Sequence, residues 1–186
     1  MTEVVIAGIG QTEVGEHWDV GLRELAFAAI QDAIKDAGGL KPQSLFVGNM
    51  LAPNLSNQAH LGVLLADYAG LLGIEAVTIE AAGASGGAAL RQGYLAIASG
   101  MVDVALVVGV EKFTDKIGSD VDTALASTSD SDFEAVQGMT PSARISAVTS
   151  TGSPEFESSG IWLRRPPMQT GISRPARSRQ LTTSEA

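Results

Sequence analysis

Residues 76–110 read AVTIEAAGASGGAALRQGYLAIASGMVDVALVVGV, and this stretch decides the fold class. Residues 76–81 are expected to form a strand, and the small and apolar residues 84–99 continue at helical spacing until Gly100 ends them. Arg91 is the only charge in that predicted helix, so we expect a central helix buried on every side. Residues 102–110 form a nearly continuous apolar run, which is typical of a strand covered on both faces.

The residues that precede this stretch show the same alternation of strand and helix. Apolar runs predict strands at residues 4–9 and 44–47, and apolar residues at helical spacing predict helices at residues 22–34 and 61–72. Alternating strands and helices, joined by right-handed crossovers, indicate an α/β fold with a mostly parallel sheet.

Composition limits the size of the core and the classes of partner. The chain has 186 residues, 45% of them hydrophobic, which suits a single core and therefore one main domain. Its formal net charge of −9 repels nucleic acid and anionic lipid, so neither partner is expected. It contains no cysteine, which excludes disulfides, thiolate metal sites and thiol chemistry. No metal site is expected.

The sequence also predicts a location. The apolar run near the N-terminus follows Glu3 and has neither a basic region nor a cleavage-like site, which argues against a signal peptide. No apolar stretch reaches the roughly 18 residues of a membrane span. We therefore predict a cytoplasmic protein.

The character of the sequence changes near residue 145. Residues 151–186 contain ten Ser or Thr, four Pro and five Arg, and they show no apolar period. Such a segment cannot bury enough surface to offset the entropy of ordering. We expect a domain at residues 1–145 and a tail at residues 146–186, which is either disordered by nature, as a regulatory tail, or an altered, out-of-frame C-terminus.

Two other patterns are weak. The segment 8–13 begins like a dinucleotide fingerprint but lacks the third glycine, so we interpret its glycines as easing a turn after the first strand. The acidic segment 115–134 lacks the spacing and the glycine of a calcium loop.

The junction at residues 81–87 is the strongest candidate for chemistry. A glycine-rich turn here leads from a buried strand into the N-terminus of a helix, where backbone N–H groups and the helix dipole stabilise negative charge. A cysteine at this place would have a lowered pKa, and the same N–H groups would help to bind an oxyanion.

Residues 80–91, EAAGASGGAALR, resemble the nucleophile segment of the thiolase family, most closely the archaeal and sterol-carrier type. The family's pattern runs from small residues into Cys, Ala, Ser or Thr, and Gly, and the position of the nucleophilic cysteine is occupied here by Gly83. Residues 98–113 resemble the family's next strand, and residues 5–10 its first strand. The resemblance covers residues 1–145 and so the N-terminal half of the family's layered fold.

The resemblance implies a function in which an acyl group moves from coenzyme A to the cysteine and then to another acyl-CoA. A coenzyme A thioester would be the substrate, with no bound cofactor, and residues 114–145 would begin the loop region that covers the active site. The family's second cysteine and its histidine lie in the C-terminal half. We therefore expect a thiolase-like acyl-CoA acyltransferase by ancestry that is inactive as a truncated, cysteine-less chain. The alternative is a non-catalytic acyl-CoA-binding or assembly subunit.

The resemblance also implies a homodimer, because the strand that leads to the nucleophile lies at a two-fold contact. Val77 and Ile79 are the candidate interface residues.

Rival interpretations rest on single residues. Residues 83–87 satisfy the G-x-S-x-G spacing of a serine hydrolase with Ser85 as nucleophile, but no histidine follows in the chain order of that fold. The two histidines, His17 and His60, are expected to have surface or hydrogen-bonding roles. Glu75 and Glu80 flank the strand at residues 76–81 and are too far apart to work as an acid and base pair, about 17 Å along an extended strand.

Overall fold

A computed structural model describes residues 3–116, 118–134 and 159–165. The elements in chain order are β1 (Val5–Gln11), α1 (Leu22–Asp36), β2 (Ser44–Gly48), α2 (Ala52–Leu55), α3 (Leu61–Tyr68), β3 (Glu75–Ile79), the short 3-10 turn η1 (Ala82–Ala84), α4 (Ser85–Ala98), β4 (Val104–Gly109), α5 (Ser119–Ala126) and β5 (Ser159–Arg164).

The strands form one sheet in the order β1-β5-β4-β2-β3. β2 runs parallel to both β3 and β4, while β5 runs antiparallel to its neighbours β1 and β4. It follows that β1, β2, β3 and β4 all point the same way. The predicted α/β class and mostly parallel sheet are confirmed.

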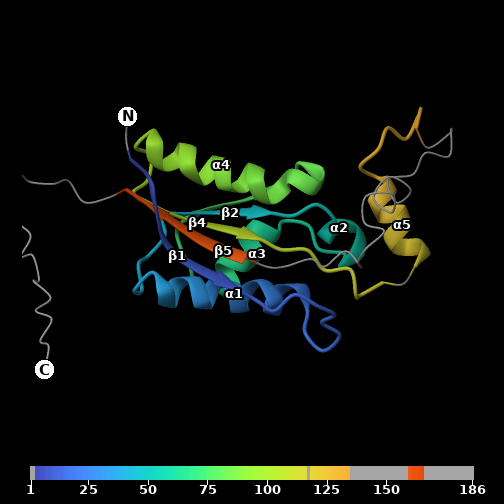
Figure 1. The fold of residues 1–186 in the computed structure, drawn as a ribbon, viewed down its shortest axis with the longest axis horizontal. Helices are drawn as coiled ribbons and strands as arrows, with labels where there is room; N and C mark the ends of the chain where they lie inside the picture. The colour runs from blue at the N-terminus through green and yellow to red at the C-terminus, as the bar shows by residue number, and fades with distance from the viewer. Residues whose placement is uncertain (1–2, 117, 135–158, 166–186) are drawn as a thin grey trace, which may run out of the picture.

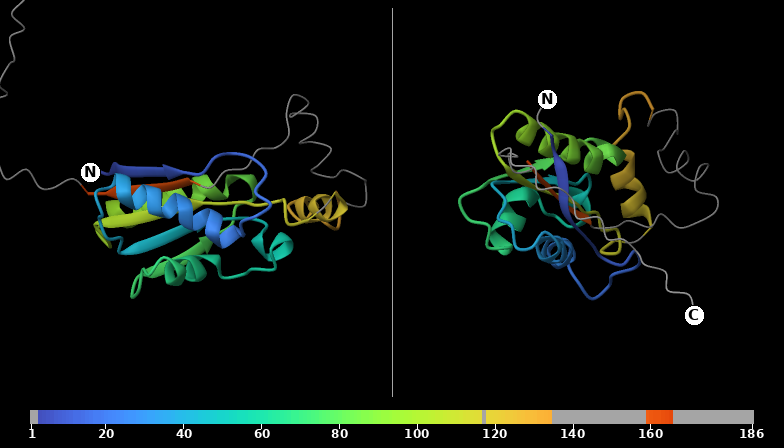
Figure 2. Two further views of the ribbon diagram at one scale, coloured as in Figure 1. Left: turned by 90° about the horizontal axis from the view of Figure 1, so that it is seen from below. Right: turned by 60° about the vertical axis from the view of Figure 1, so that its left-hand side comes forward.

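Helices cover the two faces of the sheet unequally. α1 packs on β1 and β5 and α3 packs on β3 and β2, while α4 lies on the opposite face over β4 and β2 (Figures 1 and 2). A large core cluster fills the α1 and α3 side, including Trp162 and Leu106, and a smaller one lies under α4 around Phe46 and Ile97.

α4 differs from the helix that the sequence predicted. Its sheet-facing residues Ala89, Gly93 and Ile97 are buried, but Leu90 and Tyr94 on its outward side are exposed. The expectation of a helix buried on every side is therefore wrong for the described residues. The sequence shows that this helix carries almost no charge. Whether its outward side is covered depends instead on which other parts of a protein pack against it.

β5 corrects the expectation for the tail. Residues 159–164 fall in the tail for which the sequence predicts no structure, yet they form a strand between β1 and β4, and Trp162 is fully buried. A short apolar run, residues 160–163, is enough for a strand whose hydrogen bonds are satisfied on both sides. The remaining tail, residues 146–158 and 166–186, lies outside the described residues.

The glycines at the start of the chain have a packing role. A Cβ built on Gly8 would lie 2.5 Å from the backbone nitrogen of Ala37, and one built on Gly10 would lie 2.3 Å from the carbonyl oxygen of Ala29. Both residues are inside β1, so the interpretation of a turn after the strand is wrong. They are glycines because α1 crosses the strand at backbone contact.

Candidate functional site

The turn between β3 and α4 has a left-handed residue at its centre. β3 ends at Ile79, Ala82 has φ of 49°, and α4 begins at Ser85. An alanine in this region of backbone space costs roughly 1 kcal/mol, so surrounding contacts must hold it there.

Two side chains hold this turn. The Ser85 hydroxyl donates to the carbonyl oxygen of Ala82 at 2.7 Å and accepts from the N–H of Ala81 at 2.9 Å. On the other side, the Glu80 carboxylate accepts from the N–H of Ala82 at 2.5 Å. The conformation around residue 83 is thus fixed by its neighbours on both sides in the chain.

Gly83 itself lies in open space. A Cβ built on it meets no atom within 4 Å, and its φ is outside the left-handed region. The position is exposed, and it is one residue before the last residue of η1, where the chain enters α4. The first N–H groups of a helix have no partner inside the helix, so a negatively charged side chain at residue 83 would be stabilised.

The turn rests on the end of the neighbouring strand. A Cβ on Gly48, the last residue of β2, would lie 2.6 Å from the carbonyl oxygen of Ser85 and 2.8 Å from the Cα of Gly86. Only a glycine allows the backbones to approach this closely. This contact sets the height of α4 above the sheet.

A buried polar cluster holds the chain beyond β2. The Asn49 side chain donates to the carbonyl oxygen of Val110 at 2.8 Å and to Glu111 at 2.9 Å. The same Glu111 carboxylate accepts from the backbone N–H of Met50 at 2.9 Å and of Leu51 at 3.2 Å. The Asn49 N–H reaches across to the carbonyl oxygen of Ile79 at 3.2 Å, so the cluster ties together the ends of β2, β4 and β3.

Burial raises the pKa of Glu111 above its ordinary value of 4.5, against the opposing effect of the hydrogen bonds from Met50, Leu51 and Asn49. Sequence reasoning missed this cluster. The available signal was an amide directly after the carboxyl end of one buried strand and a carboxylate two residues after the end of another.

The rival nucleophile Ser85 is engaged by the turn. Its hydroxyl is buried and both of its hydrogen bonds go to the backbone of residues 81 and 82. The Nε2 atom of His17 lies 2.8 Å from the carbonyl oxygen of Glu13, and His60 is exposed at the start of α3 with φ of 60°. This geometry favours a structural role for Ser85.

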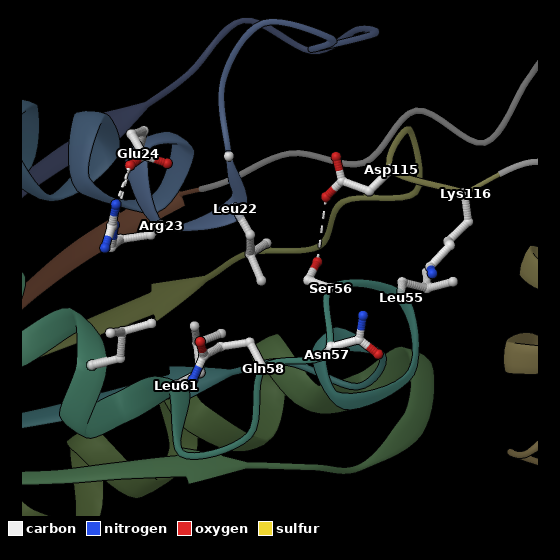
Figure 3. Close-up of a pocket in the computed structure, with 12 residues that line it drawn as sticks. Leu22, Arg23, Glu24, Leu55, Ser56, Asn57, Gln58, Leu61, Asp115 and Lys116 are labelled. Atoms are coloured by element: carbon white, nitrogen blue, oxygen red, sulfur yellow. Dashed lines mark hydrogen bonds and ion pairs between the residues drawn. The ribbon is translucent and has the colours of Figure 1, made fainter.

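A pocket of about 400 Å³ lies beside the N-terminus of α1 (Figure 3). Arg23, Glu24, Asp115 and Lys116 line it, so its charges balance, and Ser56 makes a long hydrogen bond of 3.5 Å to Asp115. Arg23 and Glu24 pair with each other at 2.8 Å. Gly83 does not line this pocket, so we place the candidate site at the turn and not here.

The acidic segment forms a helix. Residues 119–126 are α5, and Ala124 packs against Leu51 and Leu55. Within the described ranges, no group of three or more His, Asp or Glu side chains could hold a metal ion. Over the same part of the chain, no helix is long and apolar enough to cross a membrane.

The turn between β3 and α4 lies within a much longer stretch of the chain that matches a known protein family. The model of the family "Thiolase, N-terminal domain" matches residues 4–154, most of the chain. The chain belongs to the thiolase family. The matched range includes Gly83 and extends past residue 145.

Curated relatives of this thiolase-family chain include two archaeal proteins. It is 45% identical over 142 residues to an acetyl-CoA acetyltransferase of Methanothermobacter thermautotrophicus, covering 75% of this chain and 37% of the relative. The corresponding protein of Methanocaldococcus jannaschii is 44% identical over 142 residues, with 75% and 36% covered. A benzoylsuccinyl-CoA thiolase subunit, BbsB, of Thauera aromatica is 34% identical over 140 residues, covering 73% of this chain and 34% of the relative. The chain thus spans little more than a third of these relatives.

Solved structures show the same fold. An acetyl-CoA acetyltransferase from Syntrophomonas wolfei matches with a TM-score of 0.60 at 14% identity, covering 88% of this chain and 64% of that one. A 3-oxoacyl-[acyl-carrier-protein] synthase III from Aquifex aeolicus matches with a TM-score of 0.63 at 15% identity, covering 89% and 55%. The thiolase-like layered fold predicted from the sequence is confirmed.

Proposed function

We propose that this chain corresponds to the N-terminal half of an acyl-CoA acyltransferase of the acetyl-CoA acetyltransferase type, that Gly83 occupies the position of the family's nucleophile, and that acyl transfer does not occur. The acyltransferase ancestry follows from the family and from relatives at 45% identity. The observation that carries the rest is the position of Gly83. It has room for a side chain at the start of a helix, and the turn around it is held by Ser85 and Glu80.

The loss of turnover has a chemical reason. Acyl transfer of this kind needs a thiolate that attacks the thioester carbonyl and leaves again, and the chain contains no cysteine at all. Ser85 does not substitute, because its hydroxyl is committed to the backbone of the turn. No base is proposed either, because the His17 ring is engaged with the carbonyl oxygen of Glu13 and, in the described part of the chain, the His60 side chain makes no hydrogen bond to the turn.

The substrate proposed for this fold is a coenzyme A thioester, and no tightly bound cofactor is proposed. Two relatives carry acetyl-CoA in their names, and a third is named for benzoylsuccinyl-CoA. Because this chain spans little more than a third of their length, binding of acyl-CoA by the chain is itself part of the proposal. The cytoplasmic location predicted from the sequence is also retained here.

A non-catalytic subunit is the second candidate. The intact turn without a nucleophile supports it, as does the relative that is named as a subunit. Such a subunit would keep acyl-CoA binding or assembly and lose chemistry.

The predicted homodimer would use β3. Among the described residues β3 pairs with β2 alone, so its other edge is open, and Val77 is exposed while Ile79 is partly buried. An open edge can accept a second strand. We propose that β3 of a second copy does so.

The test is thiolysis of acetoacetyl-CoA, together with calorimetric titration of acetyl-CoA, on the purified chain and on Gly83→Cys. We expect no thiolysis by either protein. Turnover by the unaltered chain above the no-enzyme background would overturn the proposal. Binding of acetyl-CoA without turnover would support the non-catalytic subunit, and absence of both would remove acyl-CoA as its ligand.

A further inference from the structure

The sheet has two edges, and β1 forms one of them. Among the described residues β1 pairs with β5 alone and β3 pairs with β2 alone, so each of these strands has one side without a neighbouring strand. Figure 2 shows β1 at the margin of the sheet, beside β5. The backbone N–H and C=O groups on the outer side of an edge strand can bond a strand of another molecule.

The composition of β1 favours the addition of a strand. Its sequence, VIAGIGQ, contains no charge and no proline, and Ile6 and Ile9 are each 61% exposed. Apolar, uncharged strands without proline are the segments that pair most readily with copies of themselves. Folded proteins close such an edge with a bulge, a charged side chain or a covering segment. We therefore looked for a feature of this kind on the outer side of β1.

The carboxylate of Asp36 bonds the middle of this edge. The backbone N–H of Ile9 donates to Oδ2 of Asp36 at 2.9 Å. In an antiparallel pair every second residue bonds the neighbouring strand, and the residues between direct their N–H groups to the other side. Ile9 is one of these outward-directed residues, since its N–H is bonded by a side chain. A carboxylate is a stronger acceptor than the carbonyl oxygen of an incoming strand.

The short side chain of Asp36 reaches the strand because α1 lies unusually close to it. A Cβ built on Gly8 would lie 2.8 Å from the Cβ of Ala37, the residue that follows Asp36 in the chain. A larger residue than glycine in β1 would push the end of α1 outward and carry the carboxylate away from Ile9. The glycines of β1 and Asp36 therefore act together, although Ile9 and Asp36 are 27 residues apart.

The helix itself does not explain an aspartate at this position. Asp36 is the last residue of α1 and is exposed. A negative charge at the C-terminus of a helix is unfavourable, because the helix dipole is negative there. A residue that opposes the local preference of its own helix indicates a gain elsewhere, and the bond to β1 is that gain.

A second irregularity lies at the same place on the edge. Ile6 pairs with Leu163 and Gly8 with Trp162, so the register between β1 and β5 shifts between Ile6 and Gly8 and leaves Ala7 as an extra residue. A bulge interrupts the regular spacing of the N–H and C=O groups that an incoming strand would need. The bulge and the Asp36 bond thus act on neighbouring residues in the middle of β1.

We propose that Asp36 closes the outer edge of β1 against the addition of a strand, and that without this carboxylate β1 pairs antiparallel with β1 of a second copy. The contact lies wholly within residues 9–36, so it does not depend on the part of the relatives that this chain lacks. At the opposite edge, no side chain in the described part of the chain bonds a backbone N–H of β3. Asp36 therefore makes the two edges unequal, and the inference is independent of acyl-CoA binding.

The experiment measures the association of the full chain by analytical ultracentrifugation for the wild type and three variants, with circular dichroism to establish that each is folded. We expect Asp36→Ala to associate about ten-fold more tightly than the wild type, or more, because neither copy has to break a charge-assisted hydrogen bond before the strands pair. Asp36→Asn keeps an oxygen that accepts from Ile9 and should associate as the wild type does. Asp32→Ala removes the same charge from an exposed residue one turn earlier in α1 and is the matched control.

Hydrogen exchange gives a second readout at the edge itself. In dilute Asp36→Ala the amide of Ile9 should exchange faster than in the wild type, and it should become protected again as the protein concentration rises. Adding Val77→Glu on β3 should leave this concentration dependence unchanged, because the other edge of the sheet is not involved. The proposal is overturned if Asp36→Ala associates no more tightly than the wild type, if Asp36→Asn or Asp32→Ala associates as tightly as Asp36→Ala, or if Val77→Glu removes the gain.

Discussion

Gly48 and Gly83 lie at the same end of the sheet, at or just beyond the carboxyl ends of the neighbouring strands β2 and β3, and they are glycines for different reasons. A Cβ on Gly48 would lie 2.6 Å from the backbone of Ser85, whereas a Cβ on Gly83 would meet nothing within 4 Å. Packing therefore requires a glycine at residue 48 and does not require one at residue 83. Residue 83, the position that we propose for the nucleophile, is therefore an open position on a tightly packed support.

The largest expected effect separates the two glycines directly. Gly48→Ala should destabilise the protein by about 3 kcal/mol, because the methyl group forces the backbone of α4 away from β2. Gly83→Ala should change the free energy of unfolding by less than about 0.5 kcal/mol. Urea unfolding of both variants measures this difference. Equal destabilisation would show that residue 83 is as tightly packed as residue 48.

The stability of the packed strand ends beneath the turn should also depend on Glu111. Glu111→Ala removes one of the two acceptors of the Asn49 side-chain amide and the acceptor for the N–H of Met50, so donors that are now satisfied lose their partner. We expect a loss of about 2 kcal/mol in the free energy of unfolding. Thr123→Ala, at an exposed hydrogen bond within α5, is the control and should have a much smaller effect.

The pKa of Glu111 gives that prediction a pH dependence. Because burial raises the folded-state pKa above 4.5, the folded protein binds this proton more tightly than the unfolded chain does. The associated stability is present below pH 4.5 and is lost as pH rises through the folded-state pKa. The stability advantage of the wild type over Glu111→Gln should therefore be larger at pH 4 than at pH 7, and the opposite trend in urea titrations would contradict the assignment.

Gly83→Cys tests the open position. A thiol at the start of α4 should have its pKa lowered by about one unit or more from 8.5, equivalent to about 1.4 kcal/mol. The pH dependence of iodoacetamide alkylation measures the shift, with Leu72→Cys as an exposed control on a cysteine-free background. A midpoint at or above pH 8.5 would show that residue 83 is not at the family's nucleophile position.

The smallest effect concerns Ser85, whose hydroxyl holds the turn around Gly83. Ser85→Ala leaves the N–H of Ala81 without its acceptor and should cost about 1 kcal/mol in urea unfolding. In the Gly83→Cys background the same change should also raise the alkylation midpoint, because the turn no longer holds residue 83 at the helix terminus. An unchanged midpoint would assign Ser85 to stability alone.

Local patterns in the sequence determined the order of strands and helices, the strand-to-helix turn and the resemblance of residues 80–91 to the thiolase family. These features depend on residues close together in the chain, such as the helical spacing of residues 85–98 and the glycines of the turn. Gly83 could be assigned to the nucleophile position in the same way, by its neighbours alone; that assignment stays a prediction. The division of the chain at residue 145 is also untested.

Tertiary structure alone decided the features that join distant parts of the chain. Asn49 and Glu111 are 62 residues apart and meet only because β2 and β4 are neighbours in the sheet. In the sequence, residues 159–164 look like part of a polar tail. In the structure they form the strand between β1 and β4, because both of those strands pair with them. The exposed side of α4 follows from the same cause: a sequence determines how apolar a helix is, whereas the layers that surround it are set by long-range packing.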